Sequence, residues 1–291
     1  GDNFKAMGGG AIANMAMNMG ADDLKDLGGA KLANMAMNME GDNFKAMGGG
    51  AIANMAMNMD ASNFKDLGGG KLASMAMNMA GDNFKDLGGE KITNMAMNME
   101  GDNFKDLGGE KITNMATNME GDNFKELGGD TVVLMAKEMD KDMIESVGNY
   151  QAKGMAKAME DTQLSTLQSD QILGLANGIE SKQIVEIGKD RLFAMVDTIK
   201  EDDVKSLGTD HLSSMMSGIE GTQISELAEE KKISIVDNLE ANFFGSTKAE
   251  FKGIEDTSDE EARPTISEEK VGQTKITGAE KTSGLIDSFK E

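Results

Sequence analysis

Residues 101–120, GDNFKDLGGEKITNMATNME, contain two amphipathic segments separated by a pair of glycines. In the first segment, Phe104 and Leu107 stand three residues apart, a spacing that places both side chains on one face of a helix. In the second segment, four apolar residues follow the i, i+3, i+4, i+7 spacing of a single buried helical stripe: Ile112, Met115, Ala116 and Met119. We predict that these residues form the hydrophobic core of a unit made of two short helices.

The ends of the two helices are also marked by residue type. Asp102 is predicted to be the N-cap of the first helix, because its carboxylate can accept hydrogen bonds from free amides of the first turn. Gly108 and Gly109 are predicted to form the turn, with Gly108 in the left-handed conformation that glycine adopts at helix C-termini. The second helix is expected to begin near Glu110, whose charge suits a helix N-terminus.

The same pattern recurs every twenty residues. Twelve units align from Gly1 to Glu240, and residues 1–19 and 41–59 are identical. Helices this short are marginal in water by themselves, because an isolated helix needs about 12–15 residues. Packing against neighbouring units must therefore stabilise them. The predicted fold class is all-α, with residues 1–240 forming an α-solenoid of twelve 20-residue helix-turn-helix repeats.

Differences among the units indicate which positions are buried. The position of Leu107 holds only Met, Leu, Val or Ile in all units. The position of Met119 changes only to other hydrophobes of similar size, such as Ile179 and Leu239. A packed core tolerates such exchanges, so both positions are predicted to be buried.

The position between those of Met115 and Met119, the seventeenth of each unit, behaves differently. It is methionine in the first five units: Met17, Met37, Met57, Met77 and Met97. Later units place Thr117, Lys137 or Asp197 there, which indicates that the position faces solvent. Exposed apolar rows mark contact surfaces, and methionine adapts readily to different partners. We therefore expect these methionines to form a contact surface along one side of the N-terminal half. Alternatively, methionine spread by duplication and is merely tolerated there.

The first unit resembles the third and lacks the polar outer face of a capping repeat. Its open end is therefore expected to be apolar. Either further repeats precede it in a longer protein, or another molecule docks there head to tail, and a head-to-tail contact that does not close produces a filament. The sequence favours a structural or assembly protein, such as a filament subunit or a surface stalk. A scaffold that binds another protein is the alternative.

Residues 161–180, DTQLSTLQSDQILGLANGIE, differ in composition from the earlier units. They resemble the short α-helical repeats, about 20 residues long, of very large bacterial surface proteins, with a T-x-x-Q-I-x-x-L pattern. The resemblance covers roughly the last four units, and the glycine-rich first half departs from it. It implies an extracellular or cell-surface location.

The twenty-residue period ends after Glu240. Residues 241–291 contain the single proline, Pro264, and an acidic segment at 256–261 with a composition typical of disorder. We predict that Phe243, Phe244 and Phe251 cap the last unit. The second predicted domain, 241–291, is therefore a C-terminal cap followed by an acidic, partly disordered tail.

The composition argues against several kinds of partner. A formal net charge of -22 disfavours nucleic acids and anionic membrane surfaces, which bind clustered Lys and Arg. There is no run of 18 apolar residues that would span a membrane. The expected partners are therefore another copy of this chain or a different protein.

No catalytic constellation is recognisable in the sequence. The chain has no cysteine, and its one histidine, His211, is expected to face solvent near the start of a helix. The run Gly8–Gly10 is not followed by the G-K-[ST] of a phosphate loop, and no strand is predicted before it. We predict a non-enzymatic protein without a bound cofactor.

Metal binding is a rival interpretation of the methionines. Met15, Met17 and Met19 are thioethers, which are soft ligands that suit Cu(I). However, residues two apart on a helix point to different faces, so the three sulfur atoms would not converge. Acidic residues at the unit junctions lack the alternating ligands of a calcium-binding EF-hand loop. A Met-rich Cu(I)-binding protein remains an alternative to the structural role.

Overall fold

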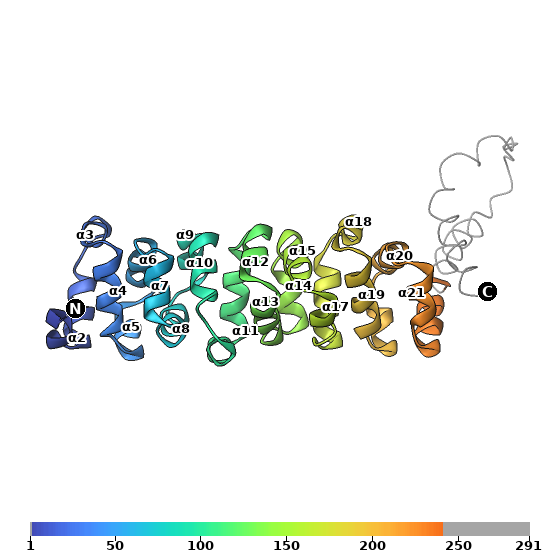
Figure 1. Ribbon diagram of the computed structural model, residues 1–291, viewed down its shortest axis with the longest axis horizontal. Helices are drawn as coiled ribbons and strands as arrows, with labels where there is room; N and C mark the ends of the chain where they lie inside the picture. The colour runs from blue at the N-terminus through green and yellow to red at the C-terminus, as the bar shows by residue number, and fades with distance from the viewer. Residues whose placement is uncertain (1, 241–291) are drawn as a thin grey trace, which may run out of the picture.

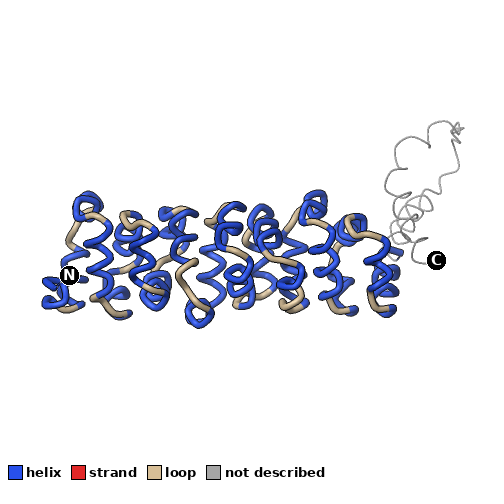
Figure 2. Tube along the Cα trace, viewed as in Figure 1, coloured by secondary structure: helices blue, strands red, loops and turns tan. Residues whose placement is uncertain are grey.

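The computed structural model describes residues 2–240, and the expectation of an all-α fold is confirmed there, since no strand occurs in that range. The predicted aromatic cap at Phe243, Phe244 and Phe251, together with the rest of the 241–291 tail, lies outside the described residues. Figure 1 shows many short helices packed side by side into an elongated body, and Figure 2 shows that only short loops join them.

Each twenty-residue unit places a short first helix before a longer second one. The first helices are α1 (Asp2–Met7), α3 (Ala21–Leu27), α5 (Gly41–Met47), α7 (Ala61–Leu67), α9 (Gly81–Leu87), α12 (Gly121–Leu127), α14 (Lys141–Ser146), α16 (Asp161–Leu164), α18 (Ser181–Ile184) with η1 (Val185–Ile187), η2 (Glu201–Ser206) and α21 (Gly221–Glu226). The second helices are α2 (Gly9–Met17), α4 (Gly29–Met37), α6 (Gly49–Met57), α8 (Gly69–Met77), α10 (Gly89–Ala96), α13 (Gly129–Lys137), α15 (Asn149–Ala158), α17 (Ser169–Gly178), α19 (Lys189–Thr198) and α20 (Thr209–Ser217). In the sixth unit α11 (Gly101–Thr117) spans both segments, and residues 229–240 are helical in the last unit.

The first helix of a unit begins earlier than the sequence suggested. In the sixth unit Glu100 is the N-cap and Asp102 lies inside the first turn, so the prediction of Asp102 as the cap is wrong. The capping side chain belongs instead to Asn103, whose Oδ1 accepts a hydrogen bond from the backbone N–H of Glu100 at 2.9 Å. Because Asn103 supplies the acceptor, the cap residue itself is free to vary, and it is Gly20, Asp60 or Ala80 in other units.

The glycine turn also differs from the expected left-handed C-cap. Gly108 has a positive φ of 72° but a ψ of 162°, which is the extended, nearly glycine-only region and not the left-handed helical one. With this conformation the chain leaves one helix and enters the next at a single residue. The second helix accordingly starts one residue before the predicted Glu110, as in α10 and α13, which begin at Gly89 and Gly129.

The second glycine of the turn is required by packing. An added Cβ at Gly109 would lie 2.6 Å from the carbonyl oxygen of Glu138 and 2.5 Å from Sδ of Met143. Glu138 closes the second helix of the next unit, and Met143 lies in the first helix of the unit after that. Because a backbone carbonyl and a side chain from two later units converge on Gly109, a residue without a side chain fits between them.

The helices pack beyond their immediate neighbours. A second helix contacts the first helix two units later, as α2 contacts α5 and α4 contacts α7. A first helix also contacts the second helix of the following unit, as α3 contacts α6 and α12 contacts α15. Together these contacts bury one hydrophobic core that runs from Ile12 to Leu239. Each unit is therefore in contact with the next two.

Candidate interaction surface

The apolar residues of the two helical stripes lie in this core. All six residues of the sixth unit that were assigned to it are buried: Phe104, Leu107, Ile112, Met115, Ala116 and Met119. Only five described residues with polar or charged side chains are buried: Asn63, Thr93, Ser169, Gln171 and Lys231. Within residues 2–240 every buried side-chain nitrogen or oxygen has a hydrogen-bond partner.

The five methionines between the core positions are exposed. Their exposed fractions are 41%, 38%, 37%, 40% and 52% for Met17, Met37, Met57, Met77 and Met97, respectively. Each lies at or just after the C-terminus of a second helix. Exposed large hydrophobic side chains at a position that tolerates Thr and Lys are available for contact with another molecule.

The direction in which these methionines face stays a prediction. In Figure 1, α6 lies near the upper edge of the body and α8 near the lower edge, although they belong to consecutive units.

The geometry of a single helix separates the sulfur atoms considered for copper. In the second unit Met35 and Met39 are fully buried, whereas Met37 between them is 38% exposed. The three thioethers thus occupy different environments and do not share one face. Among residues 2–240, no group of three or more His, Cys, Asp or Glu side chains is arranged to hold a metal ion.

A second recurrent position, which we call the clamp position, was missed in the sequence. Its residue lies in the first turn of the second helix. Its side chain donates to the backbone carbonyl just beyond the second helix two units earlier. The pairs are Lys71 with Met39, Lys91 with Met59, Lys111 with Met79, Gln151 with Met119, Gln171 with Met139, Arg191 with Met159 and His211 with Ile179. The shared feature is a hydrogen-bond donor, and a cation also suits the negative end of a helix dipole.

His211 belongs to this set, so the expectation that it merely faces solvent is wrong. Its Nε2 lies 2.8 Å from the carbonyl oxygen of Ile179, and the residue is only partly exposed. The recurrence of Lys, Gln, Arg and His at one position was the available signal. This recurrence does not predict a buried contact, because long polar side chains are usually assigned to solvent. Here their apolar stems lie between units and only the polar end makes a hydrogen bond.

Replacing Lys91 with methionine is expected to lower the free energy of unfolding by about 1 kcal/mol, because the carbonyl of Met59 loses a charged donor in a half-buried site. Lys31 provides the matched control, since it occupies the same position but is exposed and makes no side-chain hydrogen bond within residues 2–240. Urea denaturation of both variants, followed by circular dichroism, measures the difference. Equal destabilisation by the two substitutions would contradict the clamp.

Two further observations bear on possible partners. In the described part of the chain, no helix is long and apolar enough to cross a membrane. No family model matches the sequence, and comparisons with curated proteins and with solved structures found no similar protein.

Proposed function

We propose that this chain is a non-enzymatic structural protein, an α-solenoid of twelve 20-residue repeats that assembles with other copies through its exposed methionines. The observation that carries the proposal is the exposed fraction of 37% to 52% at Met17, Met37, Met57, Met77 and Met97. A polar residue at this position costs nothing, as Thr117 and Asp197 illustrate. Five apolar side chains there are best explained by a surface that becomes buried on contact.

The arrangement of the helices supports the repeat assignment. Helix boundaries recur at twenty-residue intervals, and the clamp hydrogen bonds recur at a separation of 32 residues. Stability in such an array comes from contacts between near neighbours, so the body can be long without a compact centre. Such a rod suits a filament subunit, or a stalk on the bacterial surface as the resemblance of residues 161–180 implies.

The net charge of -22 determines how assembly should respond to salt. Acidic rods repel one another at low ionic strength, and added salt screens this repulsion. Association is therefore expected to strengthen with both protein concentration and salt.

Changing all five exposed methionines to serine is expected to abolish this association while leaving the helix content unchanged, since Ser217 already occupies the position in the eleventh unit. Sedimentation velocity across a concentration series measures the effect. A variant with leucine at the same five positions is the matched control, because leucine keeps the apolar surface and should still associate. A wild-type chain that stays monomeric at all concentrations would refute self-assembly.

The second candidate is a scaffold that uses the same methionines to bind a different protein. It is favoured if the wild-type chain is monomeric while a foreign partner is retained by the wild type and by the leucine variant, but not by the serine variant. Stoichiometric Cu(I) uptake that is lost in the serine variant would instead support the copper alternative.

A further inference from the structure

The eighth unit departs from all others at positions that meet in one place. From the fifth unit to the twelfth, the position of Tyr150 is otherwise always Asp or Glu. Lys153 is the one charged residue at a position that holds Ala in the first four units. Tyr150 is the only tyrosine of the chain. The unit thus exchanges an acid for an aromatic ring and gains a cation next to it.

These residues border a pocket of about 330 Å³ between α12 and α15. Its lining consists of Gly121, Asp122, Lys125, Tyr150, Lys153, Gly154, Lys157 and Ala158. The two helices approach closely because glycines face each other, and an added Cβ at Gly154 would lie 2.9 Å from Cα of Gly121. The close contact of Gly121 and Gly154 thus brings the side chains of α12 and α15 that line the pocket near one another.

Lys153 is held largely out of solvent in this pocket. Its side chain is 17% exposed, and its Nζ lies 2.7 Å from Oε1 of Gln183 and 3.1 Å from Oε2 of Glu186. The same ammonium lies 5.7 Å from the centre of the Tyr150 ring, within the range of a cation–π contact. The tyrosine itself is 66% exposed, so one ring face remains available to a ligand.

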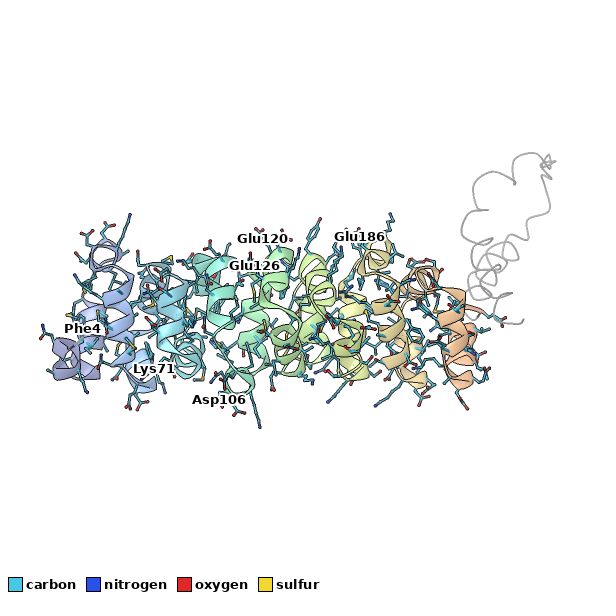
Figure 3. The ribbon with its side chains drawn as sticks, viewed as in Figure 1. Phe4, Lys71, Asp106, Glu120, Glu126 and Glu186 are labelled. Carbon is cyan, nitrogen blue, oxygen red and sulfur yellow. The ribbon has the colours of Figure 1, made fainter. Side chains whose placement is uncertain are left out.

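Glu186 acts as the internal counter-ion of this site. Besides Lys153, it approaches Nζ of Lys157 at 3.7 Å. The hydrogen bond from Lys153 and the charges of both lysines lower the pKa of the Glu186 carboxyl, which is therefore ionised at neutral pH. Figure 3 shows Glu186 at the upper edge of the body, on the part of the chain that follows α18. A half-exposed carboxylate bound to two lysines of the pocket can be displaced by another anion.

We propose that this pocket binds a small molecule that carries a carboxylate or phosphate group beside a flat apolar ring. The anion takes the place of the Glu186 carboxylate on Lys153 and Lys157, and Lys125 supplies a third cation from α12. The ring lies against the exposed face of Tyr150. Charge-assisted hydrogen bonds to the anion provide most of the affinity, and the ring provides selectivity. This site is independent of the exposed methionines and of self-assembly.

The test uses the full chain with its one tyrosine ring isotopically labelled, so that every ring signal in the NMR spectrum comes from Tyr150. The probes are phenyl phosphate, benzoate and inorganic phosphate, and benzyl alcohol serves as the uncharged ring. We expect phenyl phosphate and benzoate to shift the Tyr150 signals in a saturable manner, inorganic phosphate to bind more weakly, and benzyl alcohol to have no effect.

Three variants make the result specific. Lys153→Ala restores the residue of the first four units and should lower the affinity for phenyl phosphate about tenfold or more. Glu186→Gln removes the competing anion and should raise the affinity for phenyl phosphate several-fold. Lys137 is the equivalent of Lys157 one unit earlier and lies outside the pocket. Lys137→Met should leave the affinity for phenyl phosphate unchanged. No saturable shift, equal binding of benzyl alcohol, or unchanged affinity in Lys153→Ala and Glu186→Gln would overturn the proposal.

Discussion

Replacing Phe44 with alanine is expected to lower the free energy of unfolding by about 3–5 kcal/mol, the cost of removing a fully packed aromatic side chain. Phe44 is completely buried in α5, which packs on α2, α6 and α8. The side chain therefore joins three units, and its removal leaves a cavity that none of them can fill alone. Guanidinium denaturation followed by circular dichroism measures the change.

Phe4 is an unusually close control, because residues 1–19 and 41–59 are identical in sequence. Phe4 is only partly buried and packs at the edge of the core. Its replacement with alanine should therefore cost no more than about half as much, since less apolar surface returns to water. The two variants remove the same atoms from the same local sequence. Equal losses of stability would show that the unit, and not its surroundings, determines the contribution of the phenylalanine.

Substitution of adjacent glycines is expected to change stability in opposite directions. Gly49→Ala should destabilise the protein by about 2–4 kcal/mol, from overpacking and a lost hydrogen bond. Its Cβ would clash with Oδ1 of Asn83 and lie 2.9 Å from the carbonyl oxygen of Asn78. Asn83 cannot simply turn away, because its Oδ1 accepts the hydrogen bond from the N–H of Ala80.

Gly50→Ala should instead raise the free energy of unfolding by about 0.5–1 kcal/mol. Gly50 lies inside α6, and an added Cβ there meets no atom within 4 Å. Alanine lowers the entropy of the unfolded chain and favours the helix. Thermal unfolding of both variants under one set of conditions separates the two effects. Destabilisation of similar size at both positions would show that the close approach at Gly49 is not what makes glycine necessary.

The chain also contains a natural solution to the clash at Gly49. In the ninth unit the equivalent residue is Ser169, which donates to Oδ2 of Asp203 at 2.7 Å and accepts from the N–H of Lys200 at 3.0 Å. Ser169, from two units before Asp203, thus accepts the N–H hydrogen bond that Asn83 accepts from Ala80 at the equivalent junction. Combining Gly49→Ser with Asn83→Asp copies this pair. The double variant should be more stable than the sum of the two single changes predicts.

Hydrophobic spacing was sufficient to predict the helices and their buried faces. Phe104 and Leu107 at i and i+3, and Ile112, Met115 and Met119 at helical spacing, place these side chains on one side of each helix. This information is local, because the geometry of a helix determines which residues share a face. The alternation of short helices with glycine turns follows for the same reason.

The capping residue and the clamp could not be derived in this way. Asn103 and Asp102 are both capable caps, and the choice between them depends on where the chain enters from the preceding unit. The donor at Gln171 reaches carbonyls more than thirty residues earlier. Such partners meet only after the units have packed together, so no pattern within twenty residues contains them.

The first and third units separate the two sources of information most clearly. Their first nineteen residues are the same, and the sequence alone determines that both form a short helix, a glycine turn and a longer helix. Yet Met7 is 44% exposed and Met47 only 7%. The difference arises because α5 lies against the second helix of an earlier unit, whereas α1 has none before it in this chain. Local spacing determines which side of a helix is apolar, and the tertiary structure decides whether another helix covers it.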